Sequence, residues 1–422
     1  MFTIFRKELW TKELVAWYLY DFANSFVYIN ATAYFSQWIV VDRGLTDLWF
    51  SLPFIIATII LVFFSTFVGR IGDLKGNHAK FFAGFTFIAI AAMTALFLSG
   101  RFIPGMPGVV LALIFFGIYQ FGYQLALVPY TAFIKYISRE EIYGKVSGIG
   151  FTSGQLGNIL GLLATLPIIN HQVTFFGTDR LSTLVPSILL FLVFFLPSFF
   201  IFRKKYFPPT LETEKPQRVW RAFVDNLKKS RKHPGVFRLL LSYYLFSDAI
   251  NTLSLFAAIY LQKVFGIGDV AKASIILIIL VGVGIGSFVG GTLADRFGHR
   301  KILVFSLLVE TLTVGTIALN KSPELLSTIF FIFGLAMGII YATSRSYLAS
   351  LIPKNESGTY FGLYTFAERF ASVIGPLVWS FVIIVASSLA PANYRIAAFV
   401  MAVFVLCATI PFLRKKPLFV EA

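Results

Sequence analysis

The chain has 422 residues, of which 57% are apolar, and its mean hydropathy of +0.80 is too high for a soluble domain. The formal net charge of +16 would suit a nucleic-acid-binding protein, but the Lys and Arg residues gather between long apolar runs, which argues against that class. Cys407 is the only cysteine and lies in an apolar run, so the sequence excludes disulfides and thiolate metal sites.

Apolar runs of this length predict transmembrane helices, because about 20 residues are needed to cross the hydrocarbon core. The sequence therefore predicts an all-α integral membrane protein. In chain order, twelve spans are expected at residues 15–39, 48–71, 80–99, 107–133, 143–168, 182–202, 236–262, 271–294, 301–319, 325–351, 358–386 and 394–413.

The distribution of basic residues predicts the orientation of these spans. The termini and the connections on their side would hold 26 of the 36 Lys and Arg residues, and such a bias is typical of cytoplasmic loops. Both termini are therefore expected in the cytoplasm. The short loops and compact size favour a prokaryotic cell (inner) membrane, and we expect a monomer.

One connection is long, and it divides the chain. Residues 1–202 are expected to form an N-terminal six-helix half, and residues 236–422 a C-terminal six-helix half. Residues 203–235 between them are polar and basic, which predicts a cytoplasmic linker. Part of this linker has an apolar helical face that suits an interfacial helix, with a calmodulin-type target as the alternative. The residues of that face are Trp220, Phe223, Val224 and Leu227.

The two halves repeat the same landmarks. The second and eighth spans both end with a glycine, an aspartate four residues later and another glycine three residues after that. Asp21 and Asn24 of the first span likewise recur as Asp248 and Asn251 of the seventh. Internal duplication of a membrane domain is typical of secondary transporters. The glycine–aspartate pattern consists of Gly69, Asp73 and Gly76 in one half and of Gly291, Asp295 and Gly298 in the other.

The repeated glycine–aspartate pattern is predicted to be a cytoplasmic gating motif. Its aspartate would accept hydrogen bonds from amides at a neighbouring helix N-terminus and so hold one conformation closed. Arg296 and Arg300 follow the second copy and supply nearby cations. The alternative is an interfacial acid that only sets the topology.

These motifs resemble the signature loops of the major facilitator superfamily, and the resemblance covers essentially the whole chain. Residues 17–25, 147–157 and 344–376 are also similar to the vacuole-effluxer-like branch, which contains autophagy-related amino-acid effluxers. The resemblance implies the major facilitator fold, with two pseudo-symmetric halves that open a central cavity alternately to either side. It also implies efflux of a small molecule and a role for the motif around Asp21.

Charged and amide side chains inside the predicted spans are the candidates for binding and coupling. An ionised side chain at the bilayer centre costs about 2.5–3.5 kcal/mol on insertion scales, so it usually faces a cavity or a partner. The substrate and coupling candidates are Asp21, Asn24, Ser25, Gln120, Gln124, Asp248, Asn251, Glu310, Arg345, Glu368 and Arg369.

Each of these candidates has a structural alternative. Asp21, Asn24 and Ser25 share one helix face and could bind an ammonium group or carry a proton, or the acids of both halves could brace neighbouring helices. Gln120 and Gln124 could line the cavity or join helices as polar contacts. Glu310 is either a coupling acid or an acid paired within the second half.

The predicted eleventh span and its neighbour contain a further cation and acid. Arg345 could anchor a substrate carboxylate and Glu368 could act as a coupling acid, with Arg369 beside it. The alternative is a buried Arg345–Glu368 salt bridge that holds the second half together. Neighbours in sequence point about 100° apart, so Glu368 and Arg369 cannot both face one point.

Glycines at four-residue spacing, such as Gly154 with Gly150 and Gly282 with Gly286, predict closely packed helices. All four histidines lie in predicted loops, so neither a metal site, a cofactor nor an enzyme activity is expected.

Together these features predict a secondary active transporter of a small polar metabolite. An amino acid is favoured because the resemblance to the vacuole-effluxer-like branch implies it, and because acids and arginines in one bundle could hold both ends of a zwitterion. Proton coupling is a hypothesis based on the acids within the spans. The alternatives are another cargo on the same fold (a sugar, drug or lipid) and a non-transporting sensor or scaffold.

Overall fold

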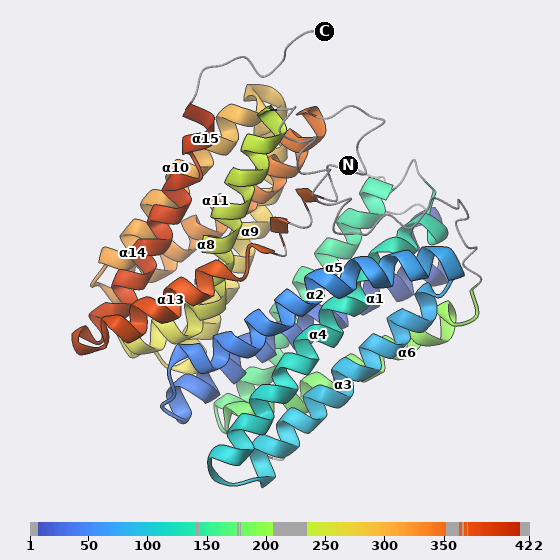
Figure 1. The fold of residues 1–422 in the computed structure, drawn as a ribbon, viewed down its shortest axis with the longest axis horizontal. Coiled ribbons are helices and arrows are strands. Elements are labelled where there is room, and N and C mark those ends of the chain that lie inside the picture. Colours follow the sequence, from blue (N-terminus) through green and yellow to red (C-terminus); the bar gives the residue numbers. More distant parts are fainter. Residues whose placement is uncertain are drawn as a thin grey trace. The chain divides into compact units, whose positions relative to one another are not determined.

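The computed structural model describes residues 7–139, 143–174, 177, 179–205, 234–351, 363–364, 367–368 and 370–413 (Figure 1). The regular structure of these residues is helical, and they contain no strand. They include nine helices that are long and apolar enough to cross a membrane, and two shorter apolar helices, Asp47–Leu61 and Ile374–Val385. The fold class predicted from the sequence, an all-α membrane bundle, is confirmed.

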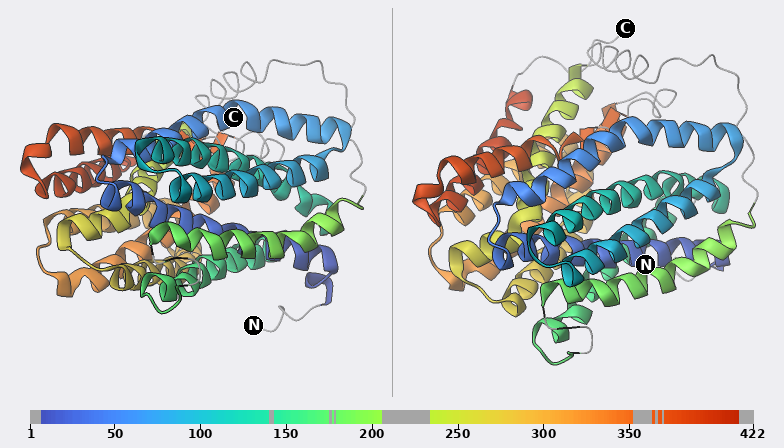
Figure 2. Two further views of the ribbon diagram at one scale, coloured as in Figure 1. Left: turned by 90° about the horizontal axis from the view of Figure 1, so that it is seen from below. Right: turned by 60° about the horizontal axis from the view of Figure 1, so that its bottom comes forward.

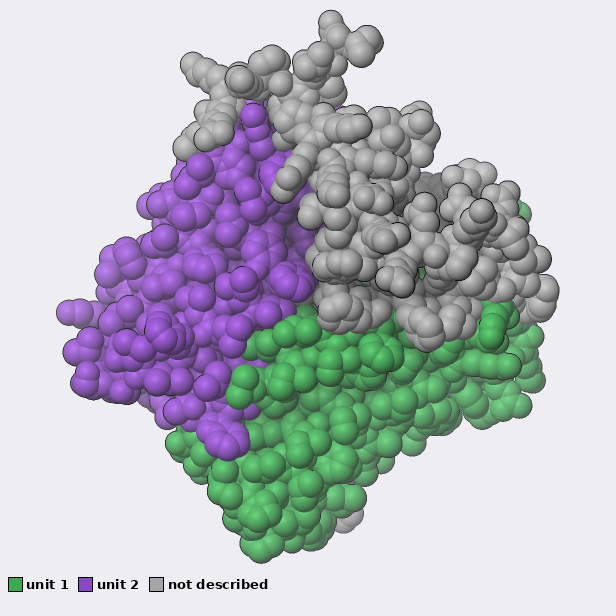
Figure 3. Space-filling model, viewed as in Figure 1, with its two compact units in different colours: residues 1–45, 52–214 green, residues 46–51, 215–422 purple. Residues whose placement is uncertain are grey.

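The chain forms two compact units (Figure 3). Unit 1 comprises residues 1–45 and 52–214, and unit 2 comprises residues 46–51 and 215–422. The main division falls within residues 206–233, which lie outside the described residues. The predicted basic linker at 203–235 and its interfacial helix therefore stay predictions for most of their length.

Within each unit the helices run alongside one another, as two further views show (Figure 2). The helices of unit 1 are α1 (Lys12–Asn30), α2 (Asp47–Lys75, apart from its first turn), α3 (His78–Phe102), α4 (Gly105–Ile137), α5 (Tyr143–Ile169) and α6 (Leu184–Phe202). The helices of unit 2 are α8 (Pro234–Phe265), α9 (Asp269–Phe297), α10 (His299–Leu319), α11 (Leu326–Leu351), α13 (Ile374–Val385), α14 (Ala392–Cys407) and α15 (Ile410–Leu413).

Two predicted spans are interrupted in the structure. The last, expected at 394–413, is divided into α14 and α15 by a turn at residues 408–409. The eleventh, expected at 358–386, contains a turn at residues 371–373, directly before α13 begins at Ile374. Apolar runs do not reveal such breaks, because hydropathy reports burial in lipid and not the continuity of the backbone hydrogen bonds.

Small residues determine which helices come closest in each unit. A Cβ atom added at Gly157 of α5 would lie 2.1 Å from the carbonyl oxygen of Phe22 in α1. A Cβ atom added at Gly286 of α9 would lie 2.0 Å from the carbonyl oxygen of Leu335 in α11. Only glycine permits such approaches, so the close packing predicted from the glycine spacing is confirmed. The α1–α5 contact is the one that positions Asp21.

Candidate functional site

Asp21 lies half-buried on α1 in unit 1, next to the glycine stripe of α5. A Cβ atom added at Gly154 would lie 3.0 Å from Ser25 Oγ and 3.4 Å from Asp21 Oδ2. Asp21 and Ser25 therefore share one face of α1, as their spacing predicts. The missing side chain at Gly154 lets the backbone of α5 approach the carboxylate closely.

A reciprocal pair of hydrogen bonds holds α1 to α4 one turn before Asp21. Trp17 Nε1 donates to the carbonyl oxygen of Tyr130 at 2.9 Å, and the Tyr130 hydroxyl donates to the carbonyl oxygen of Trp17 at 3.2 Å. The two rings stack with centroids 4.7 Å apart and planes 7° apart. The Tyr130 hydroxyl also interacts electrostatically with Asp21. The carboxylate is thus placed by a rigid aromatic contact.

Further tyrosines lie beside this carboxylate. Tyr28 of α1 stacks on Tyr123 of α4 with ring centroids 5.3 Å apart, and Tyr119 lies 5.7 Å from Tyr123. Tyr123 also interacts electrostatically with Asp21. The π faces of tyrosine attract cations, so a carboxylate among tyrosines is a favourable environment for an ammonium group.

Several buried polar atoms near these tyrosines have no hydrogen-bond partner within the described residues. They are Asn24 Oδ1, the Tyr119 hydroxyl and both polar atoms of the Gln120 amide. Asn24 and Gln120 are each only 2% exposed. Because buried polar groups are normally paired, these atoms are suited to meet a ligand or water. Gln124, on the same helix as Gln120, has an interaction of its own.

Asp248 occupies the matching position in unit 2, but its surroundings differ. Its side chain is 0% exposed, and Oδ2 accepts a 2.7 Å hydrogen bond from the amide of Gly375. Gly375 is the second residue of α13, so the carboxylate caps the N-terminus of this helix, where the dipole favours negative charge. The bracing alternative is therefore confirmed for Asp248. A role of this residue in transport stays a prediction.

Asn251 braces the same break in the helix. Its Nδ2 donates to Ser372 Oγ at 3.2 Å, and its Oδ1 accepts a 3.2 Å hydrogen bond from the Tyr341 hydroxyl of α11. The pair Asp248 and Asn251 thus connects α8 to the turn before α13. Each pair also includes one buried oxygen without a hydrogen-bond partner within the described residues, Asp248 Oδ1 in unit 2 and Asn24 Oδ1 in unit 1.

Glu368 in unit 2 interacts electrostatically with a second group of tyrosines. The rings of Tyr243 and Tyr364 lie 3.9 Å apart, and the Tyr364 hydroxyl is 2.9 Å from Ser344 Oγ. Glu368 interacts with both of these tyrosines, and Arg345 interacts with Tyr364.

Arg345 and Glu368 are both exposed and form no ion pair with each other. The alternative of a buried Arg345–Glu368 salt bridge is therefore wrong. Arg369 lies outside the described residues.

Glu310 lies on α10 in unit 2, and its side chain is buried. Its side chain is 0% exposed, and neither carboxyl oxygen has a hydrogen-bond partner within the described residues. The partner expected for a purely structural acid is thus absent from the described part of unit 2. Glu310 interacts electrostatically with Tyr341.

The repeated glycine–aspartate motif forms the turns after α2 and α9. Gly76 has a φ of 64° and Gly298 a φ of 93°, a region that favours glycine, so the last glycine of each copy ends one helix and permits the next to begin. The side chains of Asp73 and Asp295 lie outside the described residues, as do their predicted contacts. Gly69 and Gly291 lie within α2 and α9, one turn before these aspartates.

The sequence interpretation missed the tyrosines around the acids, in particular Tyr28, Tyr130 and Tyr341. Tyrosines in membrane helices concentrate at the interfaces, so tyrosines in the middle of apolar runs were the available signal. Gly154 was visible as part of the four-residue glycine spacing, and Gly375 only as part of a family motif. Their function here is steric, since each faces an aspartate of the first helix in its unit.

Comparisons with known proteins support the same fold and family. A family model described as Major Facilitator Superfamily matches residues 273–419. The chain is 26% identical over 385 residues to an uncharacterised MFS-type transporter, YxiO, of Bacillus subtilis, with 87% of each protein covered. It is 22% identical to autophagy-related protein 22 of Yarrowia lipolytica over 58% of this chain and 46% of that protein.

A solved structure shows the same architecture. The nucleoside transporter NupG aligns with a TM-score of 0.75 and 13% identity, covering 95% of this chain and 98% of that one. At this identity the likeness concerns the fold. The sequence matches show that the chain is similar to transporters of the major facilitator superfamily, and also to autophagy-related protein 22.

Proposed function

We propose that the chain is a secondary transporter that moves an amino acid across the membrane by alternating access. The observation that carries this proposal is the environment of Asp21, a half-buried acid inside a membrane helix with Gly154 packed closely against it and tyrosines beside it. An acid within a transmembrane helix generally serves a pathway or a ligand. Carboxylate and aromatic faces together suit a primary ammonium group.

Unit 2 contains a cation of its own that suits a carboxylate. Arg345 is an exposed cation on α11 that forms no ion pair within the described residues. A guanidinium binds a carboxylate through two parallel hydrogen bonds, which gives geometric selectivity as well as charge pairing. We therefore propose Asp21 as an ammonium-binding residue of unit 1 and Arg345 as a carboxylate-binding residue of unit 2, and each is tested by itself.

Proton coupling is the proposed driving mechanism. Glu310 supports it, because a buried carboxyl group without an ionic partner is costly to keep ionised in an apolar interior. Glu368 is the second proposed coupling acid, since it is exposed and interacts with Tyr243 and Tyr364. A change of protonation at Glu310 or Glu368 would alter the electrostatic interaction of that group with the tyrosines beside it.

We further propose that the protein acts as a monomer in a prokaryotic cell membrane with both termini in the cytoplasm. The support is the excess of Lys and Arg on the side of the termini. Reporters fused to the two ends should both report the cytoplasm, and reporters on opposite sides of the membrane would contradict this topology.

A neutral polar cargo, such as a nucleoside or a sugar, is the second candidate. The unpaired Tyr119 hydroxyl and Gln120 amide favour it, because they can hydrogen-bond a neutral molecule without a charge. Such a cargo would depend on Gln120 and be indifferent to Arg345, whereas an amino acid would depend on both Asp21 and Arg345.

The test is uptake of labelled amino acids into proteoliposomes, with and without an imposed pH gradient. Wild type should accumulate at least one amino acid, and the gradient should increase its uptake. Glu324→Gln is the matched control, because Glu324 is an acid in the short helix η6 (Pro323–Leu325) after α10, outside the proposed subsites. Uptake of labelled nucleosides or sugars without any amino-acid uptake would favour the second candidate, and uptake unaffected by the gradient would contradict proton coupling.

A further inference from the structure

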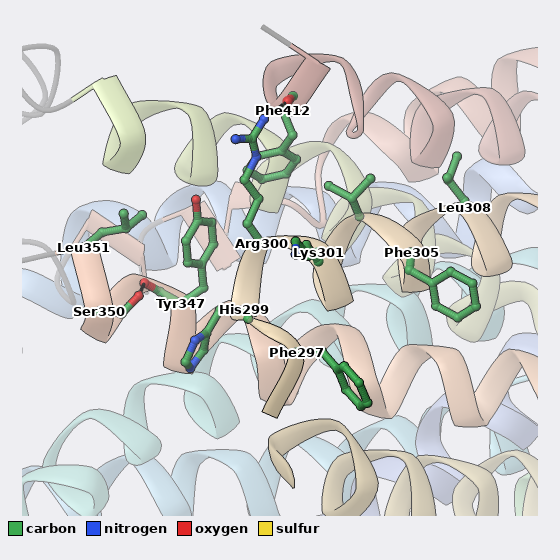
Figure 4. Close-up of a pocket in the computed structure, with 12 residues that line it drawn as sticks. Phe297, His299, Arg300, Lys301, Phe305, Leu308, Tyr347, Ser350, Leu351 and Phe412 are labelled. Carbon is green, nitrogen blue, oxygen red and sulfur yellow. Dashed lines mark hydrogen bonds between the residues drawn. The ribbon is translucent and has the colours of Figure 1, made fainter. Parts of the chain in front are cut away.

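A groove of about 860 Å³ lies in unit 2 at the turn between α9 and α10, and it shares no residue with the two proposed cargo subsites. Residues of α10, α11 and α15 form its walls (Figure 4). Those that matter here are His299, Arg300, Lys301, Phe305, Leu308, Tyr347 and Phe412.

One end of the groove is basic. His299, Arg300 and Lys301 are consecutive at the start of α10. Arg300 Nη2 donates a hydrogen bond to the carbonyl oxygen of Phe412 in α15, and Figure 4 shows its side chain extended toward that residue. Neither Arg300 nor Lys301 forms an ion pair within the described residues. The positive charge at this end is therefore available to an anion.

Two further features favour a phosphate group at the same end. The Tyr347 hydroxyl has no hydrogen-bond partner within the described residues, although the side chain is only 5% exposed and lines the groove. The N-terminus of α10, a helix of 21 residues, has no side-chain cap, so its first amides and its dipole also favour an anion. A hydroxyl donor, two cations and free helix amides together match the oxygens of a phosphate.

The rest of the groove is apolar and continues along the helix. Val304, Phe305 and Leu308 follow Lys301 on α10 at intervals of three to four residues, which places them on one face. Phe305 is 64% exposed and Leu308 43% exposed, and Leu312, at 72% exposed, extends the stripe by another turn. In Figure 4, Phe305 and Leu308 lie farther along α10 from Arg300. An exposed apolar stripe on a membrane helix suits an acyl chain.

We propose that this groove binds a phospholipid with an anionic headgroup. The phosphate lies between Arg300, Lys301 and Tyr347, and an acyl chain follows Phe305 and Leu308 along α10. The lipid belongs to the leaflet beside the α9–α10 turn, which the charge distribution predicts to be cytoplasmic, where anionic headgroups attract basic clusters. A bound headgroup would connect α10, α11 and α15.

The experiment measures binding of phosphatidylglycerol to the delipidated full-length protein in detergent by native mass spectrometry, with phosphatidylcholine as the neutral comparison. The variants are Arg300→Gln/Lys301→Gln and the single Lys301→Gln. The matched control is Lys321→Gln, which removes an exposed cation just beyond the other end of α10. The proposal expects wild type and the control to prefer phosphatidylglycerol. It expects the double variant to bind this lipid roughly tenfold more weakly, or weaker still, with an intermediate loss for the single variant.

Equal phosphatidylglycerol affinity in wild type, in Arg300→Gln/Lys301→Gln and in Lys301→Gln would overturn the proposal. Equal affinity of the wild type for phosphatidylglycerol and phosphatidylcholine would also overturn it. Inorganic phosphate is the third ligand in the experiment. If it displaced phosphatidylglycerol at concentrations similar to those of the lipid, the site would belong to a soluble anion and the lipid assignment would be wrong. Because Lys301 is exposed, the single variant still reports on the groove if the double variant fails to fold.

Discussion

The carboxylate of Asp248 accepts a 2.7 Å hydrogen bond from the backbone amide of Gly375, the second residue of α13. Its counterpart in the duplicated sequence, Asp21, instead faces Gly154 and interacts with Tyr130. The two positions therefore differ: Asp248 caps the helix α13, whereas the carboxylate of Asp21 is only half-buried. This difference separates a structural acid from a proposed binding acid.

Substitution of Asp248 should reveal its capping role. Asp248→Ala removes the acceptor and leaves the buried Gly375 amide unpaired, so we expect a loss of about 1–3 kcal/mol in stability. Asp248→Asn retains an acceptor oxygen and should lose less. Thermal unfolding of the purified variants in detergent measures the difference. Equal melting temperatures for Asp248→Ala and wild type would show that the hydrogen bond is not needed for stability.

Gly375 should not tolerate a side chain. An added Cβ atom would lie 2.1 Å from Thr252 Oγ1 and 2.8 Å from the carbonyl oxygen of Asp248, and the latter belongs to the backbone of α8. We expect Gly375→Ala to lower stability by about 1–3 kcal/mol through overpacking. Gly315→Ala is the control, because no atom lies within 4 Å of its added Cβ in α10. A similar melting temperature for the two variants would contradict the close α8–α13 contact.

Gly154 should affect cargo affinity more than stability. A Cβ atom there would lie 3.0 Å from Ser25 Oγ, a side-chain atom that can rotate away, and 3.4 Å from Asp21 Oδ2. We expect Gly154→Ala to fold normally but to raise the KM for transport severalfold, because the added methyl group presses on Ser25 and on the Asp21 carboxylate and displaces them. Gly84→Ala of α3, with no atom within 4 Å of the added Cβ, should leave the KM unchanged. An unchanged KM in Gly154→Ala would show that this close contact does not determine how the carboxylate meets the cargo.

Arg345 should discriminate between cargo analogues. If its guanidinium binds the cargo carboxylate, Arg345→Gln should lower the affinity for the amino acid roughly tenfold to hundredfold, as expected for loss of a charge-assisted hydrogen bond. The affinity for the decarboxylated amine should change little. Inhibition of uptake by the two compounds measures both effects. Equal losses for both compounds would assign Arg345 to folding or gating instead.

The sequence was sufficient for the class of fold because hydropathy and duplication depend on local composition. Long apolar runs give the spans, and the matching positions of Asp73 and Asp295 give the two halves. The glycine at the end of each motif lies at the turn that follows its helix, and Gly76 and Gly298 both have positive φ.

The divergence of Asp21 and Asp248 could not be predicted in the same way. It depends on which group caps the start of α13. The pair Gly375-Pro376 is a sequence signal for a break in the helix, but it does not show that Asp248 is the acid that caps the helix after it. Helix periodicity likewise does not determine whether the side chains of Arg345 and Glu368 meet in an ion pair. The tyrosine clusters combine α1 with α4 and α8 with α11, so they require a knowledge of helix packing.

The most direct test of the central claim is counterflow exchange of a labelled amino acid in proteoliposomes containing Asp21→Asn. Counterflow needs no ion gradient, so it reports on cargo binding and conformational exchange at Asp21 without a contribution from proton coupling. We predict that wild type and Glu324→Gln exchange the label, whereas Asp21→Asn, at equal reconstituted amounts, exchanges at least tenfold more slowly. Exchange by Asp21→Asn at the wild-type rate would contradict the assignment of Asp21 as the ammonium-binding group.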